Sequence, residues 1–277
     1  MKFYLFPATT QKMTIMTART EQRPSSEQVC HFLSEYASWL LGCGATCIRL
    51  EMNLTRIARA FDKNVELYIT PRHIHLSVTD TISPALKAAT CIVSVRHIPT
   101  SFNINTRLSR LSWEIADRKT GFKEAEKHFR QIVSNDIQSK ALVLMLVSVA
   151  NASFCGLFGG DNIAMATTGI ATLAGYYIKQ RMLSLGIDLR ATVFVCSFVS
   201  VVIAASGSIF HSCPSDIALA TSVLYLIPGV PFLNSFSDML YRYYICALSR
   251  FMDALVITAC LSAGMCCGML LMNAGMF

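Results

Sequence analysis

Hydrophobic and polar residues follow different patterns in the two halves of the chain, and the change falls near residue 140. Before it, apolar residues recur at helical or strand spacing among many charged ones, whereas after it long apolar runs dominate. The first pattern is typical of a water-soluble domain and the second of membrane-spanning helices. We therefore predict a flexible lead-in at residues 1–24, a soluble α+β domain at 25–138 and a transmembrane domain at 139–277.

The first half predicts a small sheet whose strands are preceded and followed along the chain by helices. Helical periodicity runs over residues 26–45, with Ser26 as a plausible cap, and a short helix is expected at roughly 52–61. Three segments alternate like strands: NVELYIT, HIHLSVTD and TCIVSVR. Two further segments with helical spacing follow at 104–119 and 121–135. Together these elements predict an α+β fold.

The second half contains five apolar spans, at roughly 141–158, 162–178, 191–210, 217–236 and 254–276. Each approaches the ~20 residues that cross a hydrocarbon core of ~30 Å. The fourth holds Pro228 and Pro231, which should break its helix because proline lacks a backbone donor and clashes with the preceding turn. The predicted fold is therefore an α+β cytoplasmic domain followed by an all-α membrane domain of about five transmembrane helices, one of them broken.

Charge supports the membrane assignment and predicts an orientation. Of the chain's residues, 53% are apolar and 15% charged, and the whole net charge of +7 lies before residue 141. The second half has five basic residues, all expected in loops on one side of the membrane: Lys179, Arg181, Arg190, Arg242 and Arg250. The opposite loops, near 159–161 and 211–216, have none. The positive-inside rule then predicts a multi-pass protein of the bacterial inner membrane, with a cytoplasmic N-terminus and a periplasmic C-terminus.

Several functional classes lose support from the sequence. The first residues lack the basic flank and apolar run of a secretory signal. The basic surplus forms no Arg/Lys run, so no nucleic-acid partner is expected. The pair His73 and His75 lacks a third ligand, and the cysteines lack zinc-site spacing, so no metal is expected. No phosphate-cradling loop or nucleophile elbow occurs, which predicts a protein that is not an enzyme and has no cofactor.

Five segments together resemble the threonine/serine exporter family: GATCIRLE, YITPRHIHLSVTD, SFNINTRLSRL, FGGD and IPGVPFLNSFSD. The resemblance runs through about residues 28–250 and is to the split, two-subunit form, in particular to the larger subunit of the enterobacterial succinate exporter. In the full-length form, a cytoplasmic domain precedes ten spans. The resemblance therefore implies a small membrane partner that carries the missing spans. Independently, five spans and a single IPGVP segment leave a second repeat to a homo-oligomer or a partner.

The family's motifs fall on particular positions of this sequence. The first maps onto Gly44, Ala45, Thr46, Arg49 and Glu51, with Leu50 where the family commonly has valine. The second maps onto Pro228, Gly229, Pro231, Asn234 and Asp238.

The broken span is the predicted substrate-binding site. Pro228, Gly229 and Pro231 should free backbone groups at membrane depth, and Asn234 adds a neutral donor and acceptor. A helix restarting after Pro231 would aim its partly positive N-terminus at a substrate carboxylate. The alternative is a kink that only shapes helix packing.

Three further sites each have a functional and a structural interpretation. Asn151 lies with Ser148 and Ser153 near one face of the first span and either lines the path or bonds a neighbouring helix. Asp238 is a proton carrier that couples or gates transport, or a simple helix cap. In the soluble domain, the motif of Thr46, Arg49 and Glu51 clamps a substrate or fixes the domain against the membrane, or Arg49 and Glu51 form an internal ion pair.

These observations predict one subunit of a secondary exporter of small carboxylates, succinate first, that works by alternating access in the lipid bilayer. Threonine/serine export is the alternative within transport, since an amino acid and a dicarboxylate share a carboxylate. A membrane-anchored ligand sensor is the alternative from another class.

Overall fold

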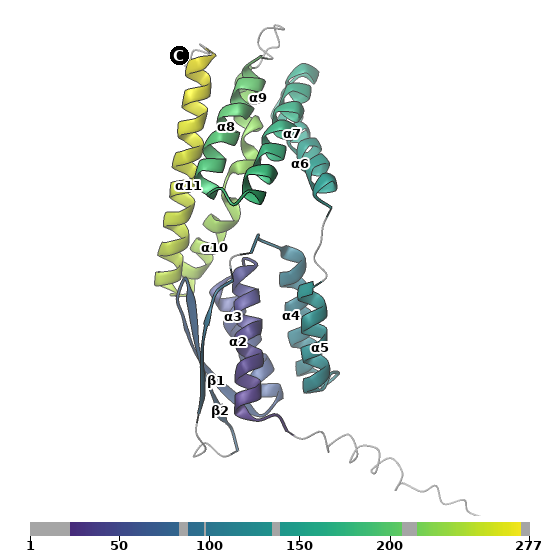
Figure 1. Cartoon of the computed structure of the whole chain (residues 1–277), viewed down its shortest axis with the longest axis vertical. Coiled ribbons are helices and arrows are strands. Elements are labelled where there is room, and N and C mark those ends of the chain that lie inside the picture. The colour runs from purple at the N-terminus through teal and green to yellow at the C-terminus, as the bar shows by residue number, and fades with distance from the viewer. Residues whose placement is uncertain (1–22, 83–87, 97, 135–138, 207–214, 273–277) are drawn as a thin grey trace, which may run out of the picture. The chain divides into compact units, whose positions relative to one another are not determined.

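The computed structural model describes residues 23–82, 88–96, 98–134, 139–206 and 215–272. The chain forms two compact units, which Figure 1 draws in one view. Unit 1 comprises Met1–Asp136 with Tyr241–Cys246, and unit 2 comprises Ile137–Leu240 with Ala247–Phe277. Nearly all of the predicted lead-in at 1–24 lies outside the described residues.

Unit 1 contains a three-stranded antiparallel sheet in the order β1-β2-β3. Its strands are β1 (Lys63–Ile69), β2 (His73–Asp80) and β3 (Ala89–Ser94). These confirm the three strands predicted from alternation. Lys63 lies opposite Asp80 and forms an ion pair with it, so the buried lysine at the start of β1 is neutralised by the end of β2.

The described residues of unit 1 also form four helices: α2 (Ser26–Gly42), α3 (Cys47–Ala60), α4 (Phe102–Ala116) and α5 (Phe122–Ser134). The cap of α2 is Ser25 rather than the predicted Ser26, because Ser25 forms a reciprocal capping box with Gln28. Helix α3 begins five residues before the predicted 52–61, since its buried residues already recur at helical spacing from Cys47.

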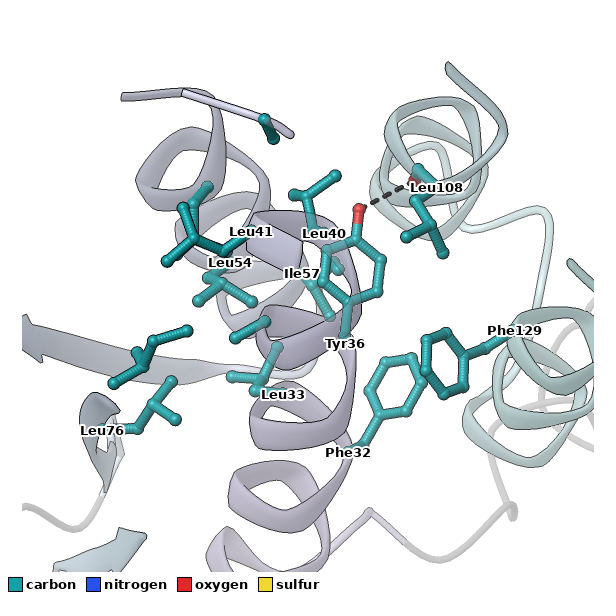
Figure 2. Packing of buried hydrophobic residues seen from close by; sticks show 14 of the residues in the cluster. Phe32, Leu33, Tyr36, Leu40, Leu41, Leu54, Ile57, Leu76, Leu108 and Phe129 are labelled. Carbon is teal, nitrogen blue, oxygen red and sulfur yellow. Dashed lines mark hydrogen bonds between the residues drawn. The ribbon is translucent and has the colours of Figure 1, made fainter. Parts of the chain in front are cut away.

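The core of unit 1 surrounds α2, which packs on the sheet with one face and on α4 and α5 with the other (Figure 2). Phe32 and Phe129 meet edge to face with ring centroids 5.8 Å apart. The buried Tyr36 hydroxyl donates to the Leu108 carbonyl at 2.8 Å. Burial raises the pKa of Tyr36 well above its usual value, so this phenol stays neutral.

Unit 2 is helical, and most of its helices run side by side (Figure 1). They are α6 (Lys140–Leu157), α7 (Asn162–Ser184), α8 (Leu189–Ser206), α9 (Ser215–Ser222), the 3₁₀ turn η3 (Leu224–Leu226), α10 (Gly229–Leu240) and α11 (Tyr244–Leu271). Among the described residues, α6, α8 and α11 are long and apolar enough to cross a membrane. The pair Asp216–Leu226 and Gly229–Leu240, bent by 63°, makes a fourth if it counts as one span. The five-span count stays a prediction, because α7 does not reach the same apolarity.

Four of the five basic residues that were predicted in loops lie in helices. Lys179 and Arg181 belong to α7, Arg190 to α8 and Arg250 to α11, whereas Arg242 lies in the turn between α10 and α11, as predicted. The helices continue beyond their apolar stretches because lysine and arginine are good helix formers. The predicted orientation, with a cytoplasmic N-terminus and a periplasmic C-terminus, rests on these residues and stays a prediction. It now depends mainly on basic residues within helices rather than in loops.

Helix α11 packs closely on α8 through two glycines. A Cβ added at Gly264 would collide with the Phe194 carbonyl oxygen, and one at Gly268 would lie 3.1 Å from the Phe198 oxygen. Small residues four apart commonly allow such close approach between membrane helices.

Candidate functional site

The break between α9 and α10 lies where the prolines predicted it, but its geometry differs. Pro228 is buried and directly precedes α10, which begins at Gly229. Pro231 lies in the first turn of α10, so the predicted restart after Pro231 is wrong. The first residues of a helix use no intrahelical N–H donor, and proline is therefore tolerated there.

Most backbone groups at the break are satisfied locally. Four N–H to oxygen bonds close it: Leu226 to Val223 at 2.9 Å, Ile227 to Leu224 at 3.2 Å, Gly229 to Ile227 at 2.9 Å and Phe232 to Pro228 at 3.2 Å. Pro231 has no N–H to donate. Among the described residues, the Val230 amide is therefore the N–H group in the first turn of α10 that has no hydrogen-bond acceptor. The break thus frees fewer donors for a substrate than its sequence suggested.

Asn151 connects three helices beside the break. Its buried side-chain amide donates to Thr172 Oγ1 of α7 at 3.0 Å and to the Thr221 carbonyl of α9 at 3.4 Å. Ser148 and Ser153 instead donate to carbonyls within α6. The contacts of Asn151 fit the interpretation that it bonds neighbouring helices, and they hold the end of α9 just before the break.

Asp238 is fully buried in α10, and its carboxylate lies 2.9 Å from the Arg250 guanidinium of α11. The Ser235 hydroxyl donates to the Ala247 carbonyl at 2.7 Å and joins the same two helices. Sequence reasoning missed Arg250 because it placed this residue in a loop. The ion pair compensates the burial of both charges.

A second charged group of unit 2 was also missed. The Lys179 amine lies 5.6 Å from the ring centroid of Tyr176 and 5.9 Å from that of Tyr225, within range of cation–π attraction. The Tyr225 hydroxyl lies 3.0 Å from Ser200 Oγ and packs against Gly175, where a Cβ would collide with it. Tyr176 and Lys179 are three residues apart, so their proximity on one helix could be predicted from the sequence. Their proximity to Tyr225 could not, because it depends on how the helices pack.

The three motif residues of the soluble unit make separate contacts. Thr46 caps α3 without a side-chain bond. Arg49 donates to Asn105 at 3.0 Å, whereas Glu51 accepts from the Tyr243 hydroxyl. Residues two apart on a helix point to different faces, and the described ion pairs include none between Arg49 and Glu51. A role for this motif stays a prediction.

Unit 1 also carries a groove of about 550 Å³ that the sequence did not indicate. Beside it, Arg56 donates to Asn53 at 2.9 Å and to Ser112 at 2.6 Å, and its guanidinium lies 3.7 Å above the Trp113 ring. Burial lowers the pKa of Arg56 from its usual value. Other charged residues lining the groove are Arg59, Arg118 and Glu51. An arginine held in this way is preorganised for an anion.

The two histidines considered as metal ligands, His73 and His75, both lie on β2. His75 contacts the Tyr68 ring at 5.8 Å. Within the described ranges, no group of three His, Cys, Asp or Glu side chains could hold a metal ion.

Comparison with known families decides the class of protein. Residues 31–272 match the model of ThrE, the threonine/serine exporter. The chain belongs to this family. It is a multi-pass membrane protein of a transport family rather than an enzyme, and the resemblance seen in the motifs is confirmed.

Two curated relatives cover most of the chain. A protein of Klebsiella aerogenes is 29% identical over 247 residues, 86% of this chain and 92% of its own length. One of Escherichia coli K12 is 26% identical over 254 residues, 89% and 94% of the two chains. Both are named as the probable succinate transporter subunit YjjP. No solved structure matches the chain.

Proposed function

We propose that the chain is the larger subunit of a two-part secondary exporter of small carboxylates in the bacterial inner membrane, with succinate as its first substrate. A small membrane subunit supplies the remaining spans, and the pair works by alternating access. The relatives' names, a transporter subunit for succinate, support the substrate and the partner.

The observation that carries this proposal is the bent helix pair at Ile227 and Pro228. An apolar stretch interrupted at a buried proline is the usual way in which transporters build a substrate site between half-helices. Pro228, Gly229 and Pro231 shape the site, and Asn234 offers a polar side chain on the second half-helix. Asn151 acts as a positioning residue through its bond to the Thr221 carbonyl.

Asp238 is the proposed coupling or gating group. Protonation of its carboxylate would weaken the pair with Arg250 and release α10 from α11. This gives proton uptake a mechanical consequence at the second half of the broken helix.

Threonine/serine export is the second candidate, and the family description favours it. A zwitterion needs an acid near its ammonium group, whereas succinate needs two cationic or donor groups. The side chains that this chain and its partner subunit together place at the site decide between succinate and an amino acid.

A ligand sensor in unit 1 is a third candidate, and the Arg56 groove is the observation that favours it. A sensor requires Arg56→Gln to change export regulation while Pro228 and Asn234 are dispensable for flux.

The direct test is efflux from cells that lack their native exporters. The chain is expressed alone and then with a neighbouring small membrane protein, and succinate, threonine and serine are assayed together. Succinate efflux that requires both proteins supports the proposal. Efflux of threonine or serine instead supports the second candidate, and no efflux under verified expression contradicts transport of these substrates.

A further inference from the structure

Lys179 of α7 is half-buried, and its amine lies against side chains of unit 2 rather than in the open. A cation held among apolar and aromatic side chains is costly without an anion nearby. The Lys179 amine lies by Tyr176, back along the helix, rather than beyond the nearer end at Ser184, where it would reach water. This orientation leaves the amine inside unit 2, where it can meet a ligand.

The described side chains of unit 2 give this amine no carboxylate. Their ion pairs are Arg190 with Asp253 and Arg250 with Asp238. Asp161 caps α7 by accepting from the Ala164 amide at 2.7 Å, and Asp188 accepts from the Arg190 amide at 2.7 Å. The two tyrosine rings attract the cation but do not neutralise it.

Tyr225 places the lysine beside the break. It belongs to η3, three residues before Pro228, and Ser200 holds its hydroxyl at 3.0 Å. The first turn of α10 offers only the Val230 amide, which cannot by itself compensate a carboxylate removed from water. The contact with the Tyr225 ring places the Lys179 amine, a full positive charge, beside the 3₁₀ turn that precedes Pro228.

We propose that Lys179 binds a carboxylate of the transported substrate, with the rings of Tyr176 and Tyr225 as the walls of the subsite and the Tyr225 hydroxyl as a neutral donor. This inference rests on the proposed function and adds the anchoring group. The ligand class is a small carboxylate, shared by succinate, threonine and serine. The second carboxylate of succinate is bound elsewhere.

Binding to the full chain purified in detergent tests the inference without transport. Succinate and threonine are titrated while the thermal unfolding temperature is followed, with 1,4-butanediol as an uncharged analogue of succinate. We expect Lys179→Gln to weaken carboxylate binding at least tenfold and Lys179→Arg to retain most of it. Arg181→Gln removes the same charge from an exposed position of α7 and should bind as the wild type does. Equal affinity in Lys179→Gln, or no carboxylate binding by the wild type, overturns the inference.

Tyr225→Phe is the second variant, for the case that Lys179→Gln does not fold. It keeps the ring and removes the hydroxyl, so it should weaken carboxylate binding severalfold while 1,4-butanediol stays without effect. Unchanged affinity in a folded Tyr225→Phe chain removes the hydroxyl from the subsite.

Efflux separates this inference from the proposed function. If the wild-type chain with its partner exports succinate and Lys179→Gln does so with the same KM, the function stands and the inference falls. If the wild type exports no carboxylate but binds one in a Lys179-dependent manner, the subsite stands and the exporter proposal falls.

Discussion

At the scale of residues, unit 2 holds its few charges and buried polar groups in three distinct ways. Asp238 pairs with Arg250, Lys179 lies against two tyrosine rings, and Asn151 bonds neutral acceptors on two other helices. In an apolar surrounding each arrangement limits the cost of burying a polar group. The ion pair and the amide find partners within the chain, whereas the lysine is the group that we propose binds an added anion.

Breaking the Asp238–Arg250 pair should destabilise the protein. Asp238→Asn leaves the largely buried Arg250 without its counter-charge, and we expect a loss of roughly 3 kcal/mol, the lower end of the range for buried pairs, because the Arg250 side chain is 21% exposed. The double variant Asp238→Asn with Arg250→Met should recover most of this loss. Thermal unfolding of the detergent-solubilised chain measures both, and equal stability of Asp238→Asn and wild type would contradict a structural ion pair.

The same substitution tests coupling. If protonation of Asp238 gates export, efflux by Asp238→Asn should lose its dependence on the proton gradient, because an amide cannot take up the proton. Rates are compared across a series of external pH values. The control is Asp253→Asn on α11, whose pair with Arg190 is exposed and 4.0 Å long. A pH profile that Asp238→Asn leaves unchanged removes Asp238 from this role.

At the scale of elements, the backbone at the break between α9 and α10 is ordered by local hydrogen bonds. Its 3₁₀ turn and local hydrogen bonds satisfy the backbone, and α6 and α7 reach its first half through Asn151 and Thr168. The prolines set its direction, with a bend of 63° between the two halves. Function in such an element depends on where the halves point more than on free backbone groups.

Removing the prolines should straighten the pair and reduce export. We expect Pro228→Ala with Pro231→Ala to lower efflux roughly tenfold, a change of about 1.4 kcal/mol in the transport barrier, while the protein still inserts. Pro228→Ala alone should carry most of the effect, since Pro231 occupies a helix position that tolerates proline. Initial efflux rates at matched membrane expression provide the measurement, and normal flux in the double variant would rule out a substrate site at the break.

Replacing a glycine at the contact between α8 and α11 should change the stability of the protein without directly altering the proposed substrate site. Gly264→Ala forces a methyl group against the Phe194 carbonyl and should cost about 1–3 kcal/mol. Gly169→Ala on α7 is the control, because its Cβ would meet Ala152 at an ordinary 3.5 Å and alanine favours the helix. Thermal unfolding compares the two, and equal behaviour would show that α11 does not pack here through glycine.

At the scale of the whole molecule, the sequence predicted features that depend on local pattern. The three strands follow from alternation at β1, β2 and β3, and the broken span follows from Pro228. Helix ends were less predictable, because a predicted apolar span stops at the first charged residue whereas the helix itself can continue. Helix α11 starts at Tyr244, ten residues before the predicted span.

Contacts between distant residues could not be predicted from local pattern. Lys179 and Tyr225 meet only because α7 packs beside η3, and Asp238 meets Arg250 only because α11 begins early. The arginine groove of unit 1 likewise combines residues of α3 with residues at the end of α4. Each of these depends on tertiary packing, which one sequence does not display.

The central claim is that this chain and a small partner together form a carboxylate exporter. The most direct measurement is the initial rate of labelled succinate transport in proteoliposomes that contain the purified chain, the partner, or both. The account predicts saturable transport only with both proteins, and transport slower by roughly tenfold in the Pro228→Ala and Pro231→Ala double variant. Transport by the chain alone, or none by the pair when both are inserted, would contradict it.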